Sequence, residues 1–138
     1  MDTEYKANCP CGEIRLTSSA KPIIEFCCHC ADCRAVIPHD FATIAFFRKS
    51  SCEITGALKI TEYIADSGNR TTREACSSCG TAMFDTSDGF PKLLGVMAEQ
   101  LLPPFESKPA FHVWVSSKLP EVKIPDGVKC YEKGIPTK

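Results

Sequence analysis

Seven of the ten cysteines in this 138-residue chain stand in three tight groups. The groups read Cys9-Pro10-Cys11, Cys28-His29-Cys30-Ala31-Asp32-Cys33 and Cys76-Ser77-Ser78-Cys79. Cysteines this close in sequence can point their sulfurs at one centre, as a tetrahedral Zn²⁺ with Zn–S bonds of about 2.3 Å requires. One ion cannot take seven thiolates, so we expect a closed site with four cysteines and a second site with three. The second site leaves one position of the ion open to another ligand.

We expect the first and third groups to form the closed site, with Cys9, Cys11, Cys76 and Cys79 as the ligands. Each group is followed directly by a glycine, Gly12 or Gly80, which permits the positive φ that turns backbone amides toward the sulfurs. The groups are 65 residues apart, from 11 to 76, so a shared zinc would tie an N-terminal hairpin to the middle of the chain. The alternative is that either pair packs as ordinary reduced cysteine.

The middle group is spaced to bind the second ion from a strand end that runs into a turn, through Cys28, Cys30 and Cys33. Three residues are candidates for a fourth ligand: Cys27, His29 and His39. On a strand, Cys27 points away from Cys28, and His29 points away from the cysteines on either side of it, which argues against these two. His39 stays open as a ligand, as a residue behind the ligands or as a surface residue. An open position could hold a small-molecule thiol as its thiolate and lower its pKa.

The remaining cysteines, histidine and arginines of interest have simpler interpretations. Cys27, Cys52 and Cys130 lie among apolar neighbours and are expected to be small core residues. His112 is expected to be a core or hydrogen-bonded histidine rather than a ligand. Arg34 follows Cys33 directly and is either a solvated side chain or a partner for Asp32 or for an anionic group of a substrate. The same alternatives hold for Arg70 and Arg73, which precede the third cysteine group.

Charge and hydropathy narrow the class of protein. The net charge is −1, and no basic run exceeds Arg48-Lys49, which argues against a nucleic-acid-binding protein. The N-terminal residues MDTEYKANCP lack an apolar region, and no apolar stretch approaches the roughly 20 residues of a membrane helix. We therefore expect a cytoplasmic protein, in which clustered cysteines are reduced and serve as metal or redox sites. The alternative of a disulfide framework fits poorly with the adjacent Cys27 and Cys28.

The pattern of apolar residues predicts one mainly β domain spanning residues 1–138, with its core at about 5–131. Short segments rich in β-branched and aromatic residues are the expected strands: 13–17, 23–27, 41–47, 52–54, 58–64, 72–76, 83–85, 93–97 and 111–115. Segment 41–47 is almost wholly apolar, which suits a strand covered on both faces. Turns are expected near 30–34 and 98–102, and the tail after Tyr131 is expected to be loosely ordered.

The order and flanks of the three cysteine groups resemble those of the glutathione-dependent formaldehyde-activating enzyme family, which is also named for its centromere-protein-V-like members. The motifs are Cys-x-Cys-Gly at 9–12, Cys-His-Cys-x-x-Cys-Arg at 28–34 and Arg-x-x-Cys-x-x-Cys-Gly at 73–80. Four flanking stretches strengthen the resemblance: Ser67-Gly68-Asn69, Gly80-Thr81-Ala82-Met83-Phe84, His112-Val113-Trp114 and Ile124-Pro125-Asp126-Gly127. The likeness extends from about residue 5 to residue 131.

The resemblance implies an Mss4-like fold, with mainly antiparallel β-sheets around a structural zinc. By motif, Cys9, Cys11, Cys76 and Cys79 would hold the structural zinc, and Cys28, Cys30 and Cys33 the catalytic zinc. The implied activity joins glutathione and formaldehyde into S-hydroxymethylglutathione, and the reverse step makes the enzyme a carbon–sulfur lyase. Arg34 would contact a carboxylate of the substrate.

Two other functions remain open. A non-catalytic zinc module for protein interaction predicts a closed fourth ligand, or no second ion, together with an exposed apolar patch. A thiol-based redox or metal sensor predicts reversible loss of metal when the middle group is oxidised. The enzyme predicts a concave pocket at Cys28, Cys30 and Cys33.

Overall fold

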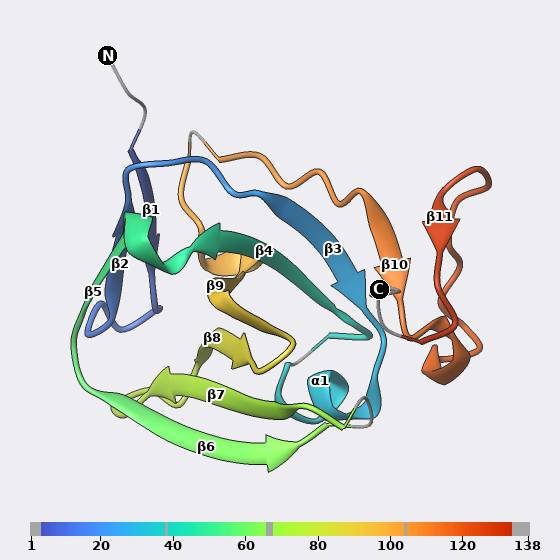
Figure 1. The fold of residues 1–138 in the computed structure, drawn as a ribbon, viewed down its shortest axis with the longest axis horizontal. Coiled ribbons are helices and arrows are strands. Elements are labelled where there is room, and N and C mark those ends of the chain that lie inside the picture. The colour runs from blue at the N-terminus through green and yellow to red at the C-terminus, as the bar shows by residue number, and fades with distance from the viewer. Residues whose placement is uncertain (1–3, 38, 66–67, 104, 134–138) are drawn as a thin grey trace.

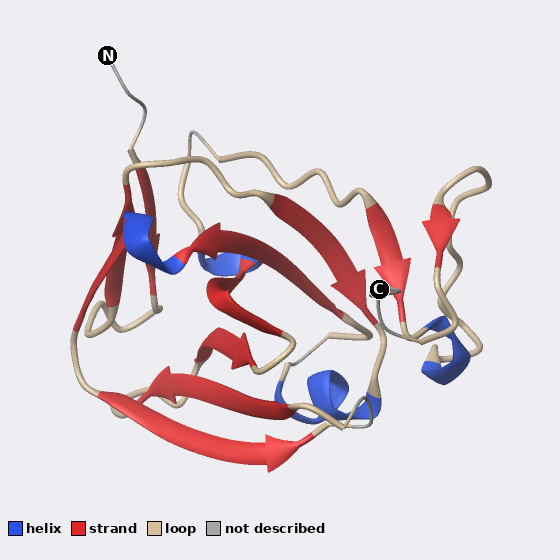
Figure 2. Ribbon diagram, in the orientation of Figure 1, coloured by secondary structure: helices blue, strands red, loops and turns tan. Residues whose placement is uncertain are grey.

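The structure is a computed structural model, and it describes residues 4–37, 39–65, 68–103 and 105–133. In this part of the chain the strands are β1 (Tyr5–Asn8), β2 (Arg15–Ser18), β3 (Ile24–Cys28), β4 (Ala42–Arg48), β5 (Cys52–Thr55), β6 (Leu58–Ile64), β7 (Arg70–Cys76), β8 (Ala82–Ser87), β9 (Phe90–Met97), β10 (Phe111–Val113) and β11 (Lys129–Cys130). The helices are the short α1 (Ala31–Val36) and the 3-10 turns η1 (Lys49–Ser51), η2 (Ala98–Gln100) and η3 (Val115–Ser117). Figure 2 shows how little of the chain is helical, and the predicted mainly β class is confirmed.

The strands form two sheets of unequal size (Figure 1). The small sheet has the order β1-β2-β5, and the large sheet has the order β11-β10-β3-β4-β9-β8-β7-β6. Most neighbours are antiparallel, but β10 runs parallel to both β3 and β11. Parallel pairing requires a crossover of about a dozen residues, and residues 114–128 supply it between β10 and β11. The small sheet is antiparallel throughout and the large sheet is mixed, so the pairing is mainly antiparallel, as the resemblance implied.

Strand β4 lies inside the large sheet and is buried on both faces, as its apolar sequence predicts. Ala45 and Phe47 point to one face and join the core that packs between the two sheets. Ile44 points to the other face and joins a second core. The second core contains Cys28 and Cys33. One strand thus supports both the packing of the small sheet and the surroundings of the middle cysteine group.

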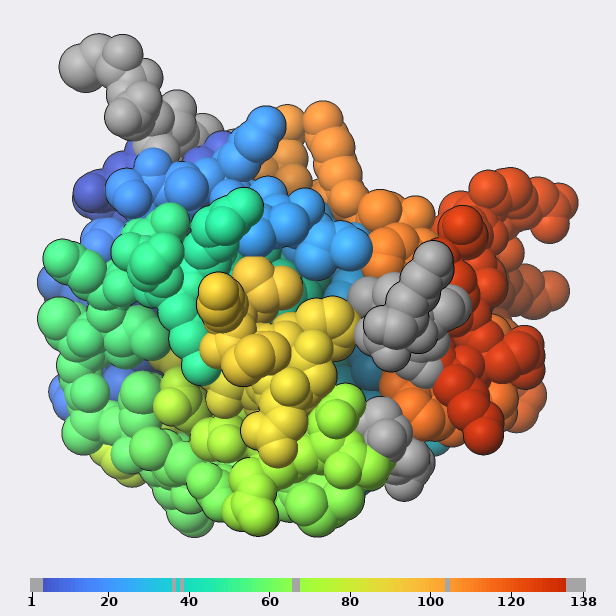
Figure 3. Space-filling view, viewed as in Figure 1, coloured from blue at the N-terminus to red at the C-terminus, as the bar shows by residue number. Residues whose placement is uncertain are grey.

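Every segment predicted to be a strand overlaps an observed one, and the turns predicted near 30–34 and 98–102 are α1 and η2. The sequence did not predict the two short strands β1 and β11. The prediction that Cys130 is a core residue is wrong, because the side chain is exposed on β11. The segment that carries β11 forms a projection at one side of the molecule (Figure 3).

The tail predicted to be loose is partly held in place. The backbone amides of Trp114 and Ser116 donate to the carbonyls of Lys133 and Glu132, at 3.0 and 3.2 Å. Residues 134–138 lie outside the described part of the chain. None of the helices in the described ranges has the length and apolar character needed to cross a membrane.

Candidate functional site

The first and third cysteine groups meet where the small sheet joins the large one. Cys9 and Cys11 lie between β1 and β2, Cys76 ends β7, and Cys79 lies in the turn to β8. The four Sγ atoms lie within 4.8 Å of one another, and Cys11 Sγ is 3.5 Å from Cys9 Sγ and 3.6 Å from Cys76 Sγ. A tetrahedral zinc with bonds of about 2.3 Å holds its sulfurs about 3.8 Å apart. The donor set and its spacing therefore fit a closed zinc site.

Backbone amides surround these sulfurs as the flanking glycines predicted. Gly12 and Gly80 both have positive φ, at 82° and 76°. The amide of Ile14 donates to Cys9 Sγ at 3.2 Å, and the amides of Ser78 and Cys79 donate to Cys76 Sγ at 3.3 and 3.4 Å. Such bonds stabilise thiolates, the form in which cysteine binds metals.

The middle group converges where β3 runs into α1. Cys28 ends β3, Cys30 caps the helix, and Cys33 lies in its first turn, so the three Sγ atoms fall within 4.8 Å of one another. Cys28 Sγ and Cys30 Sγ are 3.4 Å apart, and the amide of Cys33 donates to Cys30 Sγ at 3.3 Å. Hydrogen bonds from the other two thiols lower the pKa of Cys30. The bond with Cys30 raises the pKa of Cys28. Three convergent soft donors fit a thiophilic cation such as Zn²⁺.

In the described ranges, no fourth cysteine, histidine, aspartate or glutamate joins these three sulfurs. Cys27 points to the opposite face of the sheet, where its Sγ lies 3.6 Å from Thr43 Oγ1. His29 also points away, as strand alternation predicted, and its Nε2 lies 2.8 Å from His112 Nδ1. Burial lowers the pKa of His29 to about 4 and also lowers that of His112, so the two rings form a neutral hydrogen-bonded pair. His112 is thus a hydrogen-bonded histidine, as predicted.

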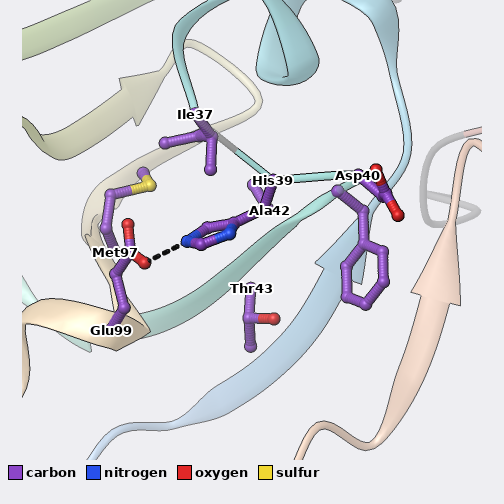
Figure 4. Close-up of a pocket in the computed structure, with 8 residues that line it drawn as sticks. Ile37, His39, Asp40, Ala42, Thr43, Met97 and Glu99 are labelled. Carbon is purple, nitrogen blue, oxygen red and sulfur yellow. Dashed lines mark hydrogen bonds and ion pairs between the residues drawn. The ribbon is translucent and has the colours of Figure 1, made fainter.

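His39 lies in a different pocket, of about 330 Å³, between the end of α1 and η2 (Figure 4). Its Nε2 is 2.6 Å from Glu99 Oε2, and the side chain is 56% exposed. The sequence left three roles open for His39, and the structure supports that of a surface residue.

The three sulfurs of the middle group open on a larger cavity, of about 640 Å³. One wall is apolar and comes from β3, β4, β9, β10 and the residue after it: Phe26, Ile44, Phe46, Phe90, Val113 and Trp114. The facing wall is mostly polar and comes from β6, β7, β8 and the loop between β6 and β7: Tyr63, Asn69, Thr71, Arg73, Asp85, Thr86 and Ser87. The cavity is therefore lined from both ends of this stretch of the large sheet, with β3 and β4 toward the top of Figure 1 and β6 and β7 at the bottom.

Arg73 is the cationic side chain beside the sulfurs, and it is only 8% exposed. Its Nη2 donates to the Tyr63 hydroxyl at 2.7 Å and to Cys33 Sγ at 3.7 Å, and its Nε lies 3.7 Å from Asp85 Oδ1. Burial raises the pKa of Asp85 to about 6, against the opposing effect of the arginine. From the sequence, Arg73 could be either a solvated surface residue or a partner for an anionic group, and no role was predicted for Tyr63 or Asp85. The one available signal was the position of Arg73, three residues before a predicted ligand cysteine in the same strand.

Arg34, the predicted carboxylate contact, lies outside this cavity. Its Nε and Nη2 donate to the carbonyls of His29 and Ser117, at 3.3 and 3.0 Å, and it lines a neighbouring cavity together with Cys79. Arg70 forms an exposed ion pair with Glu62 at 3.2 Å. The structure therefore brings all seven predicted cysteine ligands into two groups and places Arg34 apart from the middle one.

Comparisons with known proteins agree with this architecture. A crystal structure of a Rhodobacter sphaeroides protein, from a structural genomics project, superposes with a TM-score of 0.53 and 21% sequence identity, over 73% of this chain and 90% of that chain. At 21% identity, this likeness is evidence for a shared fold and for nothing further. No curated protein matches the sequence. A family model described as glutathione-dependent formaldehyde-activating enzyme matches residues 4–117, which is most of the chain. The chain therefore belongs to the glutathione-dependent formaldehyde-activating enzyme family.

Proposed function

We propose that this chain is a zinc-dependent carbon–sulfur lyase that forms or cleaves S-hydroxymethylglutathione or a similar thiol adduct. Cys28, Cys30 and Cys33 hold the catalytic ion in this proposal. Cys9, Cys11, Cys76 and Cys79 hold the structural one. The observation that carries the proposal is the group of three cysteines, without a fourth ligand in the described ranges, opening on a cavity of about 640 Å³. This volume is typical of sites for drug-sized molecules, and a tripeptide thiol is of that size.

A Zn²⁺ held by Cys28, Cys30 and Cys33 would have a vacant position, where its Lewis acidity would favour the thiolate form of a substrate thiol. The protein supplies the orientation. The polar wall, with hydroxyl groups of Thr71, Thr86 and Ser87, offers hydrogen bonds to a peptide. The apolar wall, including Phe46 and Trp114, excludes water from the sulfur. Water exclusion strengthens the electrostatic interactions on which the reaction depends.

The proposal extends to three further points. The chain acts as one domain, and it works in a reducing, cytoplasmic setting where its cysteines stay available to metal. Arg34 remains the proposed contact for a carboxylate of the substrate, at the neighbouring cavity that it lines. An interaction module with a closed fourth ligand is less well supported, because the three sulfurs face a cavity instead. A module with no second ion is tested by the zinc content.

The test combines metal content with exchange kinetics. We expect elemental analysis to give two zinc ions per chain, with one of them lost or altered by dialysis against millimolar glutathione. We also expect small amounts of protein to speed the exchange between formaldehyde and its glutathione adduct, measured by magnetisation transfer in NMR. Cys30→Ser should retain one zinc and lose the acceleration. Two tightly held ions with no acceleration of exchange would contradict the proposal. Reversible loss of zinc on oxidation, with no acceleration of exchange, would favour a redox sensor.

A further inference from the structure

We propose that Tyr63 is the catalytic acid and base of this site. Its hydroxyl donates a hydrogen bond to the aldehyde oxygen, gives it a proton as the carbon–sulfur bond forms, and takes the proton back as the bond breaks. The inference rests on the proposed lyase function and adds to it a residue outside the metal ligands.

Tyr63 reaches the cavity because of the face of β6 on which it lies. Alternate residues of a strand point to opposite faces. Ile60 and Ile64 are exposed at 59% and 63%, so they mark the outer face. Tyr63 has the opposite orientation, is half-buried, and lines the same cavity as the three cysteines.

The hydrogen bond between Tyr63 and Arg73 leaves the tyrosine proton available. A guanidinium is only a donor, so Arg73 Nη2 donates to the phenolic oxygen at 2.7 Å. The tyrosine oxygen is the acceptor in this bond, and its own O–H can therefore be directed at an acceptor in the cavity. A ligand oxygen beside the sulfurs is such an acceptor.

The same arginine nitrogen places the hydroxyl close to the sulfurs. Arg73 Nη2 is 2.7 Å from the Tyr63 oxygen and 3.7 Å from Cys33 Sγ. The sum of the two distances, 6.4 Å, is the largest separation that the oxygen and the sulfur can have. A thiol sulfur held by the cysteine group and a carbonyl oxygen one carbon away can therefore lie between them.

Charge around Tyr63 suits both directions of proton transfer. Burial raises the pKa of Tyr63 to about 12, while Arg73 opposes that rise, so the phenol keeps its proton at neutral pH. Once the proton has left, the adjacent guanidinium stabilises the phenolate. Arg73 Cζ lies 5.6 Å from the centre of the tyrosine ring, and Asp85 holds the arginine from its other side.

The atoms and charges balance. When glutathione binds as a thiolate, its thiol proton goes to the solvent. The sulfur lone pair then forms the carbon–sulfur bond, the π electrons of the carbonyl move to oxygen, and that oxygen takes the proton of Tyr63. The tyrosinate recovers a proton from the solvent. The sum is glutathione plus formaldehyde giving S-hydroxymethylglutathione, with no oxidant or reductant.

The test removes one hydroxyl group at a time. Tyr63→Phe should lower the catalysed exchange rate by roughly 10²- to 10⁴-fold, the usual contribution of a positioned acid or base. Zinc content and glutathione binding should stay unchanged. Trp114 is the single tryptophan of the chain and lines the cavity, so its fluorescence reports binding without reference to activity. Tyr5→Phe is the matched control, because Tyr5 packs against Phe47 in the other core, with ring centres 6.2 Å apart.

A second variant guards against a purely structural effect. Tyr63→Gln keeps an amide oxygen as acceptor for Arg73 but has no acidic proton, and it should show the same loss of rate with zinc retained. A wild-type rate in Tyr63→Phe would overturn the inference and leave the proposed function intact. Loss of zinc or of the fluorescence response in both variants would also overturn it. Absence of acceleration in the wild-type protein would instead contradict the proposed function.

Discussion

Arg73 and Asp85 are charged side chains buried next to the apolar core that surrounds the middle cysteine group. In the described part of the chain, Arg73 Nη1 and Asp85 Oδ1 have no hydrogen-bond partner. The two residues lie directly opposite each other on β7 and β8. A buried ion pair with unsatisfied atoms is a poor source of stability, because the cost of removing both charges from water offsets their attraction. Its presence beside the sulfurs therefore points to a role in the site.

We predict that replacing one partner of this pair lowers the free energy of unfolding more than replacing both partners. Arg73→Gln leaves the Asp85 carboxylate buried without its cation and should lower the free energy of unfolding by about 3–5 kcal/mol. Adding Asp85→Asn to the same chain should restore most of that loss. Urea unfolding of the wild type, the two single variants and the double variant measures the coupling. Simple addition of the two single losses would contradict a direct interaction.

The two cysteine groups should differ sharply in their effect on stability. Cys79 is exposed and Cys30 is half-buried, so burial alone predicts that Cys30→Ser is the more harmful change. We expect the reverse. Zinc binding at structural sites is worth about 10–16 kcal/mol in small zinc domains, which matches or exceeds the 5–15 kcal/mol of a typical fold. Cys79→Ser should therefore leave the chain largely unfolded.

Cys30→Ser is the matched control for that change. It should lower the free energy of unfolding by less than about 2 kcal/mol, because β3 and α1 are held by their own packing. Circular dichroism during urea unfolding compares the two variants. Equal losses would mean that the fold depends on both groups alike.

At the scale of elements, strand β6 shows what a sequence pattern can and cannot predict. Strand alternation puts Leu58, Ile60, Glu62 and Ile64 on one face and Tyr63 on the other. A pattern of isoleucines would normally mark the buried face, yet Ile60 and Ile64 are exposed and Tyr63 turns inward. The strand lies at the edge of the large sheet, and of its outer apolar residues only Leu58 packs against the core between the sheets. Only tertiary context decides which face of such a strand becomes part of a site.

Pairing between distant strands explains the other differences. The cysteine ligands and their glycines were predictable because each group is local in sequence. The cluster of Tyr63, Arg73 and Asp85 was not, since it depends on the register that sets Arg73 opposite Asp85 and Tyr63 opposite Thr71. The four residues of β1 are too few for a clear alternation of apolar and polar side chains. This strand forms because it pairs with β2, with Ala7 opposite Leu16.

The close packing of β4, β8 and β9 should make Gly95 intolerant of a side chain. A Cβ built there would lie 2.9 Å from Ile44 Cγ2, 3.0 Å from Phe46 Cε2 and 3.3 Å from Asp85 Cβ. All three neighbours line the cavity, so Gly95→Ala should displace its walls. We expect a loss of about 1–3 kcal/mol in the free energy of unfolding, together with a shift in Trp114 fluorescence. An unchanged unfolding curve with unchanged fluorescence would contradict this packing.

At the scale of the whole molecule, the two cysteine groups connect different parts. Cys9 and Cys11 lie between two strands of the small sheet, whereas Cys76 ends a strand of the large one, so an ion shared among them would hold the two sheets together. Cys9 and Cys76 are themselves part of the core between the sheets. The middle group instead joins β3 to the helix that follows it. Loss of the first ion should affect the entire fold, and loss of the second should affect the cavity.

Stepwise removal of metal should therefore separate the two ions. A chelator titration should take one zinc per chain while far-ultraviolet circular dichroism stays constant, and a second zinc only as the chain unfolds cooperatively. Metal binding requires thiolates, so protons compete with the ion for the same sulfurs. The stability that this binding contributes is therefore lost as the pH falls and the sulfurs take up protons. The same two steps should appear on acidification, with the thermal midpoint falling as the second ion leaves. Release of both ions in one step, or of the second without unfolding, would contradict the division between a structural and an open site.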